Sequence, residues 1–133
     1  MITLSKDMET GVEKIDSQHR ELVDRINDVL SMGEKAVSIE ETEKTINMLG
    51  DYIVKHFSDE EELQKQSGYP KYELHKEQHQ IYFTEFQKLK KEFHENGHSM
   101  EFTLHLNNSV ISWIVKHIKT VDSEFGKYYN SKK

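Results

Sequence analysis

The stretch HFSDEEEL, residues 56–63, decides how the chain folds, because it places polar side chains where the surrounding pattern expects apolar ones. The residues before it repeat apolar side chains at steps of three and four, which predicts an amphipathic helix that turns one face to a core. On that face the repeat continues through His56 and Glu60 before it becomes apolar again at Leu63. An ionised Glu in a core is costly unless other charges compensate it. The stretch therefore predicts a helix that carries a charged site into the core.

Few residues interrupt the helical pattern on either side, since the 133-residue chain has one Pro and six Gly. Asp16 is a candidate N-cap, Ser38 with Glu41 forms a capping box, and Gly68 and Pro70 separate one helix from the next. These signals predict an N-terminal arm, residues 1–14, followed by four helices, at about residues 16–36, 39–67, 70–95 and 100–129. The short connections make sequential helices antiparallel neighbours. The predicted fold is all-α, an up-down-up-down four-helix bundle formed by residues 1–133 as one domain.

The overall composition excludes several classes of function. Lys and Arg total 18 against 24 Asp and Glu, and the net charge of −6 argues against nonspecific binding of nucleic acid or of anionic membranes. No run of about 18 apolar residues could span a bilayer, and the N-terminus does not resemble a signal peptide, so a cytoplasmic location is expected. Because the chain has no Cys, any metal must be held by nitrogen and oxygen ligands.

Each predicted helix places at least one histidine on its apolar face. These residues are His19, His56, the pair His75 and His79, and His117. A single histidine at such a position is usually a hydrogen-bonded core residue, but the recurrence in all four helices favours a shared site. His56 and Glu60 are four residues apart, as are His75 and His79, so each pair projects from one helix face and can bind one centre. The other histidines, His94, His98 and His105, are expected at the surface or in packing.

Asp122 presents a problem of alignment. It follows His117 by five residues, which at 3.6 residues per turn rotates the two side chains about 140° apart. Two arrangements remain open. Either Asp122 reaches sideways to a second centre, or a π-bulge in HIKTVD turns it into line with His117.

The candidate metal ligands are five imidazoles and two carboxylates: His19, His56, Glu60, His75, His79, His117 and Asp122. Seven donors are too many for one ion and suit two. If both carboxylates and one solvent oxygen bridge the ions, three histidines complete six ligands at one ion, and two histidines leave the other with five. Two divalent ions would bring four positive charges against two from the carboxylates and one from a bridging hydroxide, which leaves the buried set nearly neutral. Imidazole with carboxylate favours iron, with manganese and zinc as alternatives.

At these positions the sequence resembles the hemerythrin family, in particular its short bacterial members. The resemblance runs through four stretches: GVEKIDSQH (11–19), HFSDEE (56–61), GYPKYELHKEQH (68–79) and WIVKHIKTVD (113–122). It implies a non-haem di-iron centre with an oxo or hydroxo bridge, bridged also by Glu60 and Asp122. It places three histidines on one iron (His75, His79 and His117) and two on the other (His19 and His56). The resemblance further implies a protein that carries or stores O2 and is not an enzyme. O2 would bind reversibly, as hydroperoxide, at the five-coordinate iron.

A carrier must keep protons and reductants away from its bound oxygen, so the open position should be dry and apolar. We expect four residues to wall this O2 pocket: Phe57, Trp113, Ile114 and Ile118. Tyr82, one turn past His79, is either a core aromatic with a hydrogen-bonded hydroxyl or a donor of protons or electrons. The alternatives to a carrier are a di-iron oxidase or peroxidase, and a sensor of O2, NO or redox state that acts through a partner protein. Many bacterial relatives carry Trp where this sequence has Leu4, which leaves the packing of the arm open.

Overall fold

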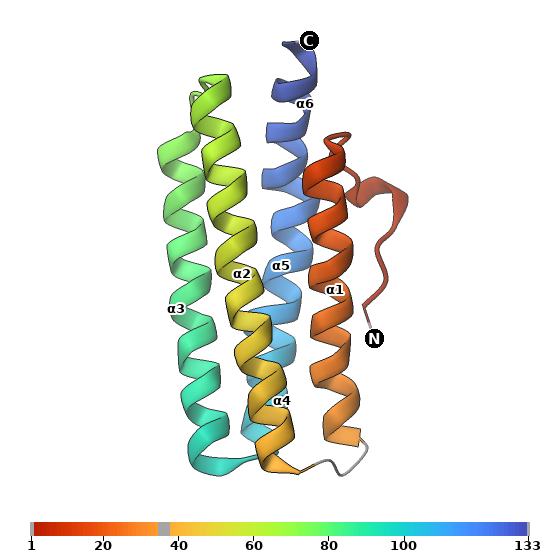
Figure 1. The fold of residues 1–133 in the computed structure, drawn as a ribbon, viewed down its shortest axis with the longest axis vertical. Helices are drawn as coiled ribbons and strands as arrows, with labels where there is room; N and C mark the ends of the chain where they lie inside the picture. The colour runs from red at the N-terminus through yellow and green to blue at the C-terminus, as the bar shows by residue number, and fades with distance from the viewer. Residues whose placement is uncertain (1, 35–37, 133) are drawn as a thin grey trace.

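The computed structural model describes residues 2–34 and 38–132, and in these ranges long helices form a bundle with an arm along one side (Figure 1). Three helices are continuous: α1 (Glu13–Glu34), α2 (Ile39–Ser67) and α3 (Tyr72–Asn96). The fourth is divided by two π-helical segments into α4 (Met100–His105), η2 (Leu106–Ile111), α5 (Ser112–His117), η3 (Ile118–Asp122) and α6 (Ser123–Ser131). The predicted fold, a four-helix bundle, is confirmed. No helix within the described ranges is both long enough and apolar enough to cross a membrane.

The ends of α2 follow the predicted capping chemistry, whereas α3 begins later than expected. Ser38 accepts a hydrogen bond on its side-chain oxygen from the backbone N–H of Glu41 at 3.2 Å. Gly68 ends α2 in the left-handed conformation at φ 69°, which glycine adopts without steric cost. The third helix was predicted from Pro70 but starts at Tyr72, because a turn intervenes in which the Tyr72 N–H donates to the carbonyl of Tyr69 at 3.2 Å.

The first helix also differs from its predicted start, at about Asp16, and begins at Glu13. The Asp16 carboxylate does not cap a helix end, because it holds the arm. It accepts hydrogen bonds from the backbone N–H and the hydroxyl of Thr10, at 2.8 and 2.7 Å, and from the N–H of Gly11 at 3.1 Å. The predicted end of this helix, at about residue 36, lies outside the described residues.

The arm packs against the bundle along much of its length. Ile2 exchanges two hydrogen bonds of 2.9 Å with the side-chain amide of Asn27, and half-buried Leu4 packs on the core. The short 3₁₀ helix η1 (Lys6–Met8) follows and buries Met8. At its other end the arm crosses α6 so closely that a Cβ on Gly126 would lie 2.3 Å from the carbonyl oxygen of Thr10.

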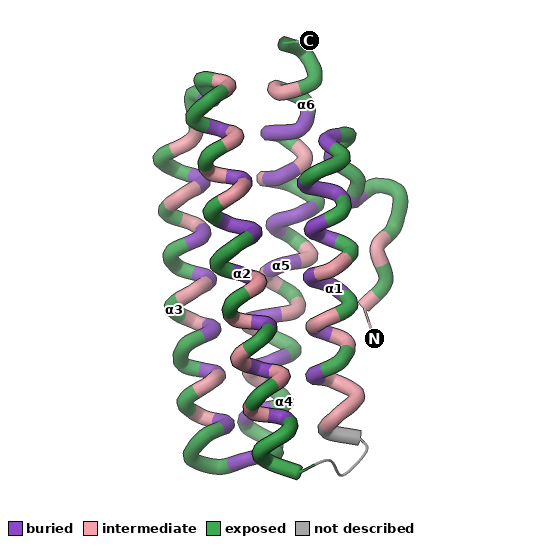
Figure 2. Tube along the Cα trace, in the orientation of Figure 1, coloured by how far each residue is buried: buried purple, intermediate pink, exposed green. Residues whose placement is uncertain are grey.

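Buried residues form an inward-facing column along every long helix (Figure 2). The apolar ones fall into two clusters, a large one that includes Tyr82 and Phe86 and a small one that includes Ile15 and Phe125. Polar residues separate the two clusters along the helices. On α1, for instance, buried His19 lies between Ile15 of the small cluster and Leu22 of the large one. The fold therefore encloses a polar layer between two apolar layers.

Candidate metal centre

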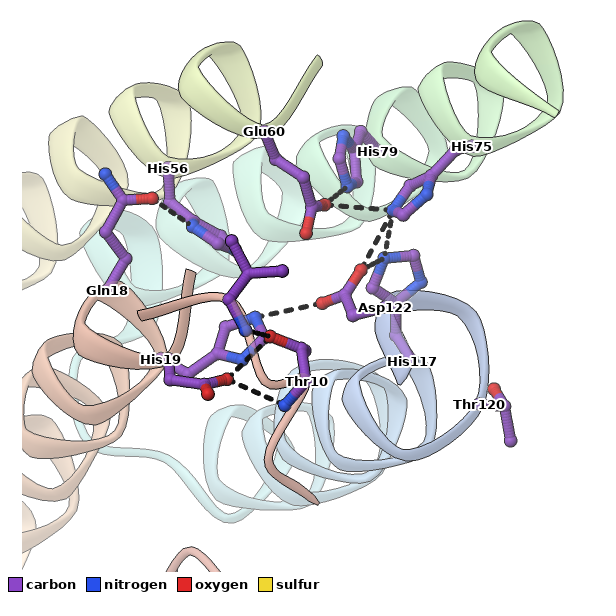
Figure 3. A network of polar contacts seen from close by, with 12 residues as sticks. Thr10, Gln18, His19, His56, Glu60, His75, His79, His117, Thr120 and Asp122 are labelled. Carbon is purple, nitrogen blue, oxygen red and sulfur yellow. Dashed lines mark hydrogen bonds and ion pairs between the residues drawn. The ribbon is translucent and has the colours of Figure 1, made fainter. Parts of the chain in front are cut away.

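The seven predicted metal ligands all lie in this polar layer and point toward one another (Figure 3). None is more than 4 % exposed. They come from α1 (His19), α2 (His56 and Glu60), α3 (His75 and His79), α5 (His117) and η3 (Asp122). The bundle thus brings together donors that are far apart in the sequence.

One group of donors contains three histidines and both carboxylates. The Nε2 atoms of His75 and His79 lie 2.9 and 3.1 Å from Oε1 of Glu60. The Nε2 atoms of His75 and His117 lie 2.9 and 3.1 Å from Oδ1 of Asp122, and 3.1 Å from each other. In this group each residue offers a donor atom within 4.8 Å of all the others. Such convergence suits a single cation.

A second group contains two histidines and the same two carboxylates. His19, His56, Glu60 and Asp122 also offer donor atoms that all lie within 4.8 Å of one another. Nε2 of His19 lies 2.9 Å from Oδ2 of Asp122, so this carboxylate turns one oxygen to each group of histidines. Glu60 and Asp122 belong to both groups. The arrangement suits two neighbouring cations that share two carboxylates.

A π-helical segment aligns Asp122 with His117. Of the two arrangements that the sequence left open, the structure has the second: residues Ile118–Asp122 form the π-helix η3. In a π-helix the side chains five residues apart take the neighbouring positions that four-residue spacing gives in an α-helix. As a result, Oδ1 of Asp122 comes within 3.1 Å of Nε2 of His117.

Four of the histidines are held from behind by side chains that the sequence analysis did not identify. Nδ1 of His56 lies 2.8 Å from Gln18, and Nδ1 of His75 lies 2.7 Å from Gln64. Nδ1 of His79 lies 2.8 Å from Glu61, and Nδ1 of His117 lies 3.1 Å from Gln78. The partner atom is an oxygen for His56, His79 and His117, which can accept the Nδ1–H, fix the imidazole and leave its Nε2 for a metal, whereas His75 faces the amide nitrogen of Gln64. Of these four side chains, only Gln64 could have been predicted from the sequence, because it follows Glu60 by four residues and so lies on the same buried helix face.

The donor atoms themselves are left without well-directed hydrogen bonds. Within the described residues, all four carboxylate oxygens of Glu60 and Asp122 lack a hydrogen-bond partner, as does Nε2 of His19, His56 and His79. Buried polar atoms without partners are rare and costly in folded proteins. A pair of cations among them would satisfy these atoms and balance the two carboxylates, so the residues present fit a metal pair.

The protein without metal balances these buried charges through its protons. Burial lowers the pKa of His56 to about 4. Burial also opposes protonation of His75, but Asp122 and Glu60 outweigh it and raise the pKa of that imidazole to about 10. In turn, the burial of Glu60 and the charge of Asp122 favour protonation of Glu60, yet His75 and His79 hold the pKa of its carboxyl at about 2. The pKa of Asp122 is held well below its usual value, chiefly by His117 against the effect of burial. Both carboxylates are therefore ionised and available as ligands.

Aromatic rings cover the three-histidine group. The ring of Phe57 stacks on His79 with a centroid distance of 3.8 Å, and Trp113 stacks on His117 at 4.4 Å. The other two residues predicted to wall an O2 pocket, Ile114 and Ile118, are buried in the large apolar cluster.

Tyr82 is fully buried, and its hydroxyl donates to the carbonyl of Val110 at 3.4 Å. Tyr82 thus has the hydrogen-bonded core role that was one of its two interpretations.

The remaining histidines bond to other residues. Nδ1 of His105 lies 2.9 Å from Glu92, and Nδ1 of His94 lies 2.9 Å from Glu43. His98 contacts the hydroxyl of Thr42 at 3.2 Å. As expected from the sequence, these three histidines have surface or packing roles.

Comparison with known proteins gives consistent matches. A family model described as "Hemerythrin HHE cation binding domain" matches residues 10–129. The bacteriohemerythrin of Methylococcus capsulatus is 31 % identical over 120 residues, which cover 88 % of this chain and 87 % of that protein. The bacteriohemerythrin of Clostridium acetobutylicum is 26 % identical over 129 residues, 94 % of this chain and 98 % of that protein. That of Stenotrophomonas maltophilia is 24 % identical over 125 residues, 94 % of this chain and 79 % of that protein.

Proposed function

The chain belongs to the hemerythrin family, and from this premise we propose that it holds two non-haem iron ions and binds O2 reversibly at one of them. Three histidines would hold one iron (His75, His79 and His117), and two would hold the other (His19 and His56). Glu60 and Asp122, with an oxo or hydroxo group, would bridge the pair. The observation that carries the proposal is that both carboxylates belong to both groups of converging donors.

The number of donors supports an O2 site at the iron that two histidines would hold. The shared carboxylates and the bridge would serve both ions equally, so the ion held by His19 and His56 would have one ligand fewer and could take O2 as a further ligand. Bound iron would supply the electrons for reversible O2 binding.

The side chains packed on the three-histidine group favour a carrier over an oxidase or a peroxidase, because the described ones among them are apolar or already hydrogen-bonded. The rings of Phe57 and Trp113 cover the imidazoles of His79 and His117 and exclude water from that side. The hydroxyl of Tyr82 is occupied by the carbonyl of Val110, and burial raises its pKa far above the usual value for tyrosine. We propose that Ile114 and Ile118, both buried, complete the apolar wall.

The test is a cycle of O2 binding and removal followed by visible spectroscopy. The protein is loaded with Fe(II) without air, exposed to O2, and then stripped of O2. A charge-transfer band that appears with O2 and disappears on its removal supports a carrier. A band that decays to a stable oxidised form, and does not return through repeated cycles, would refute reversible binding and favour a redox enzyme or a sensor.

A matched pair of variants links this band to the cluster. His56→Ala removes one imidazole of the two-histidine group and should abolish the band. His105→Ala removes an imidazole that pairs with Glu92 instead, and should leave the band unchanged.

A further inference from the structure

The five histidines of the cluster differ in what lies behind them, at the nitrogen that faces away from the donor group. In three cases the neighbour is a neutral amide, from Gln18, Gln64 or Gln78. Nδ1 of His19 has no hydrogen-bond partner among the described residues. His79 alone has a carboxylate there, since its Nδ1 lies 2.8 Å from Oε2 of Glu61.

The geometry around His79 fixes both ends of its ring. Nε2 faces Oε1 of Glu60 at 3.1 Å, and Nδ1 faces Glu61 at 2.8 Å. The Phe57 ring lies parallel to the imidazole, with an interplanar angle of 3°, and prevents it from tilting. On one side the His79 imidazole therefore contacts Glu60, which belongs to both donor groups. On the other side it contacts Glu61, which lies outside them.

Glu61 is a partly exposed carboxylate at the edge of a groove. Its side chain is 20 % exposed, and it lines a groove of about 500 Å³ between α2 and α3 together with Val54, Phe57 and Phe83. A charged group that keeps contact with solvent costs less to hold in place than a fully buried one. Glu60, the residue before it, lies instead among the buried donors.

A carboxylate accepts a stronger hydrogen bond from an imidazole N–H than a neutral amide does, and it increases the electron density on the opposite nitrogen. Extra electron density and a nearby negative charge both stabilise the higher oxidation state of a bound metal. The amides behind His56, His75 and His117 add no such charge.

We propose that Glu61 is a positioning residue that makes His79 the most strongly donating imidazole of the cluster and lowers the reduction potential of the iron pair. This inference rests on the proposed function, because it concerns iron held at the same site. It adds that Glu61, a residue in an open groove outside the donor groups, influences the reduction potential of the iron pair.

The test compares the reduction potentials of iron-loaded variants. Glu61→Gln keeps a side-chain oxygen to accept the Nδ1–H of His79 but removes the charge, so two ions should remain bound and the potential should rise. Glu62→Gln removes an equal charge from the next residue, which is exposed and contacts Gln66, and should shift the potential far less. The opposite change, Gln78→Glu, places a carboxylate behind His117 and should lower the potential.

A second readout does not depend on iron chemistry. Glu61→Ala removes the hydrogen-bond acceptor, so Zn(II) affinity measured by competition with a chelator should fall roughly 10- to 100-fold. Glu62→Ala should leave Zn(II) affinity unchanged.

The outcomes separate this inference from the proposed function. If Glu61→Gln and Glu62→Gln both hold two irons at equal potentials, the inference is wrong and the di-iron site stands. If the unmodified protein takes up no iron, the proposed function fails and the inference fails with it.

Discussion

Removal of the metal should lower the melting temperature of this protein by about 15 °C. The site buries two ionised carboxylates whose oxygens have no well-directed hydrogen bond among the described residues, so in the metal-free protein only nearby protonated histidines offset their burial. One ion present at 1,000 times its Kd stabilises the folded state by about 4 kcal/mol. An unfolding entropy of roughly 2.1 cal/mol/K per residue, applied to 133 residues, converts this free energy into a shift of about 15 °C. The second ion adds to the shift.

The assay is thermal unfolding followed by circular dichroism or calorimetry, on protein loaded with Fe(II) without air and on the same protein after treatment with a chelator. The control is the double variant Glu60→Ala/Asp122→Ala, which lacks both shared carboxylates. Iron should leave its melting temperature unchanged. Equal melting temperatures for the loaded and metal-free forms of the unmodified protein would refute the claim that the polar layer is built around metal.

Three further predictions follow from individual contacts. Glu60→Ala should lose one or both irons, counted by elemental analysis of the purified protein, because this carboxylate belongs to both donor groups. In the metal-free protein the pKa of His75 is raised to about 10, so the stability that its proton provides is complete below pH 6.5 and is lost as the pH rises through 10. Melting temperatures of the metal-free protein should therefore fall over this range, while those of the loaded protein, in which this imidazole is a neutral ligand, should not show this loss. Gly126→Ala should destabilise the protein by about 1–3 kcal/mol in chemical denaturation, because the new Cβ would lie 2.3 Å from the carbonyl oxygen of Thr10.

Each of these predictions has a control or a contradicting result. His105→Ala should keep full iron content, and loss of iron there would mean that the ligands are wrongly assigned. A metal-free melting temperature that is constant from pH 6.5 to 10 would contradict the protonated state of His75. Lys127→Ala changes the exposed neighbour of Gly126 and should change stability by less than about 0.5 kcal/mol.

The sequence predicted the bundle and the membership of the polar layer because both depend on helical periodicity. The spacing that puts Ile53 on the buried face of α2 also puts His56 and Glu60 there, and the structure buries all three. Capping chemistry likewise predicted the ends of α2, since Ser38 and Gly68 act within a few residues of their own positions.

The features that the sequence did not decide depend on contacts between helices. The spacing of His117 and Asp122 was compatible with a π-bulge, but HIKTVD contains no Gly or Pro that would require one. Glu61 and Gln78 reach their histidines across the gap between neighbouring helices, and those contacts depend on how the helices are rotated against each other. Asp16 was read as a helix cap from its local sequence, whereas its partners Thr10 and Gly11 belong to the arm.

The most direct test of the central claim is the number of iron ions bound per chain at saturation, measured by anaerobic titration with Fe(II). Two groups of converging donors that share Glu60 and Asp122 predict two ions. Saturation at one ion, or no binding, would contradict the proposal that these seven residues form a single di-iron centre.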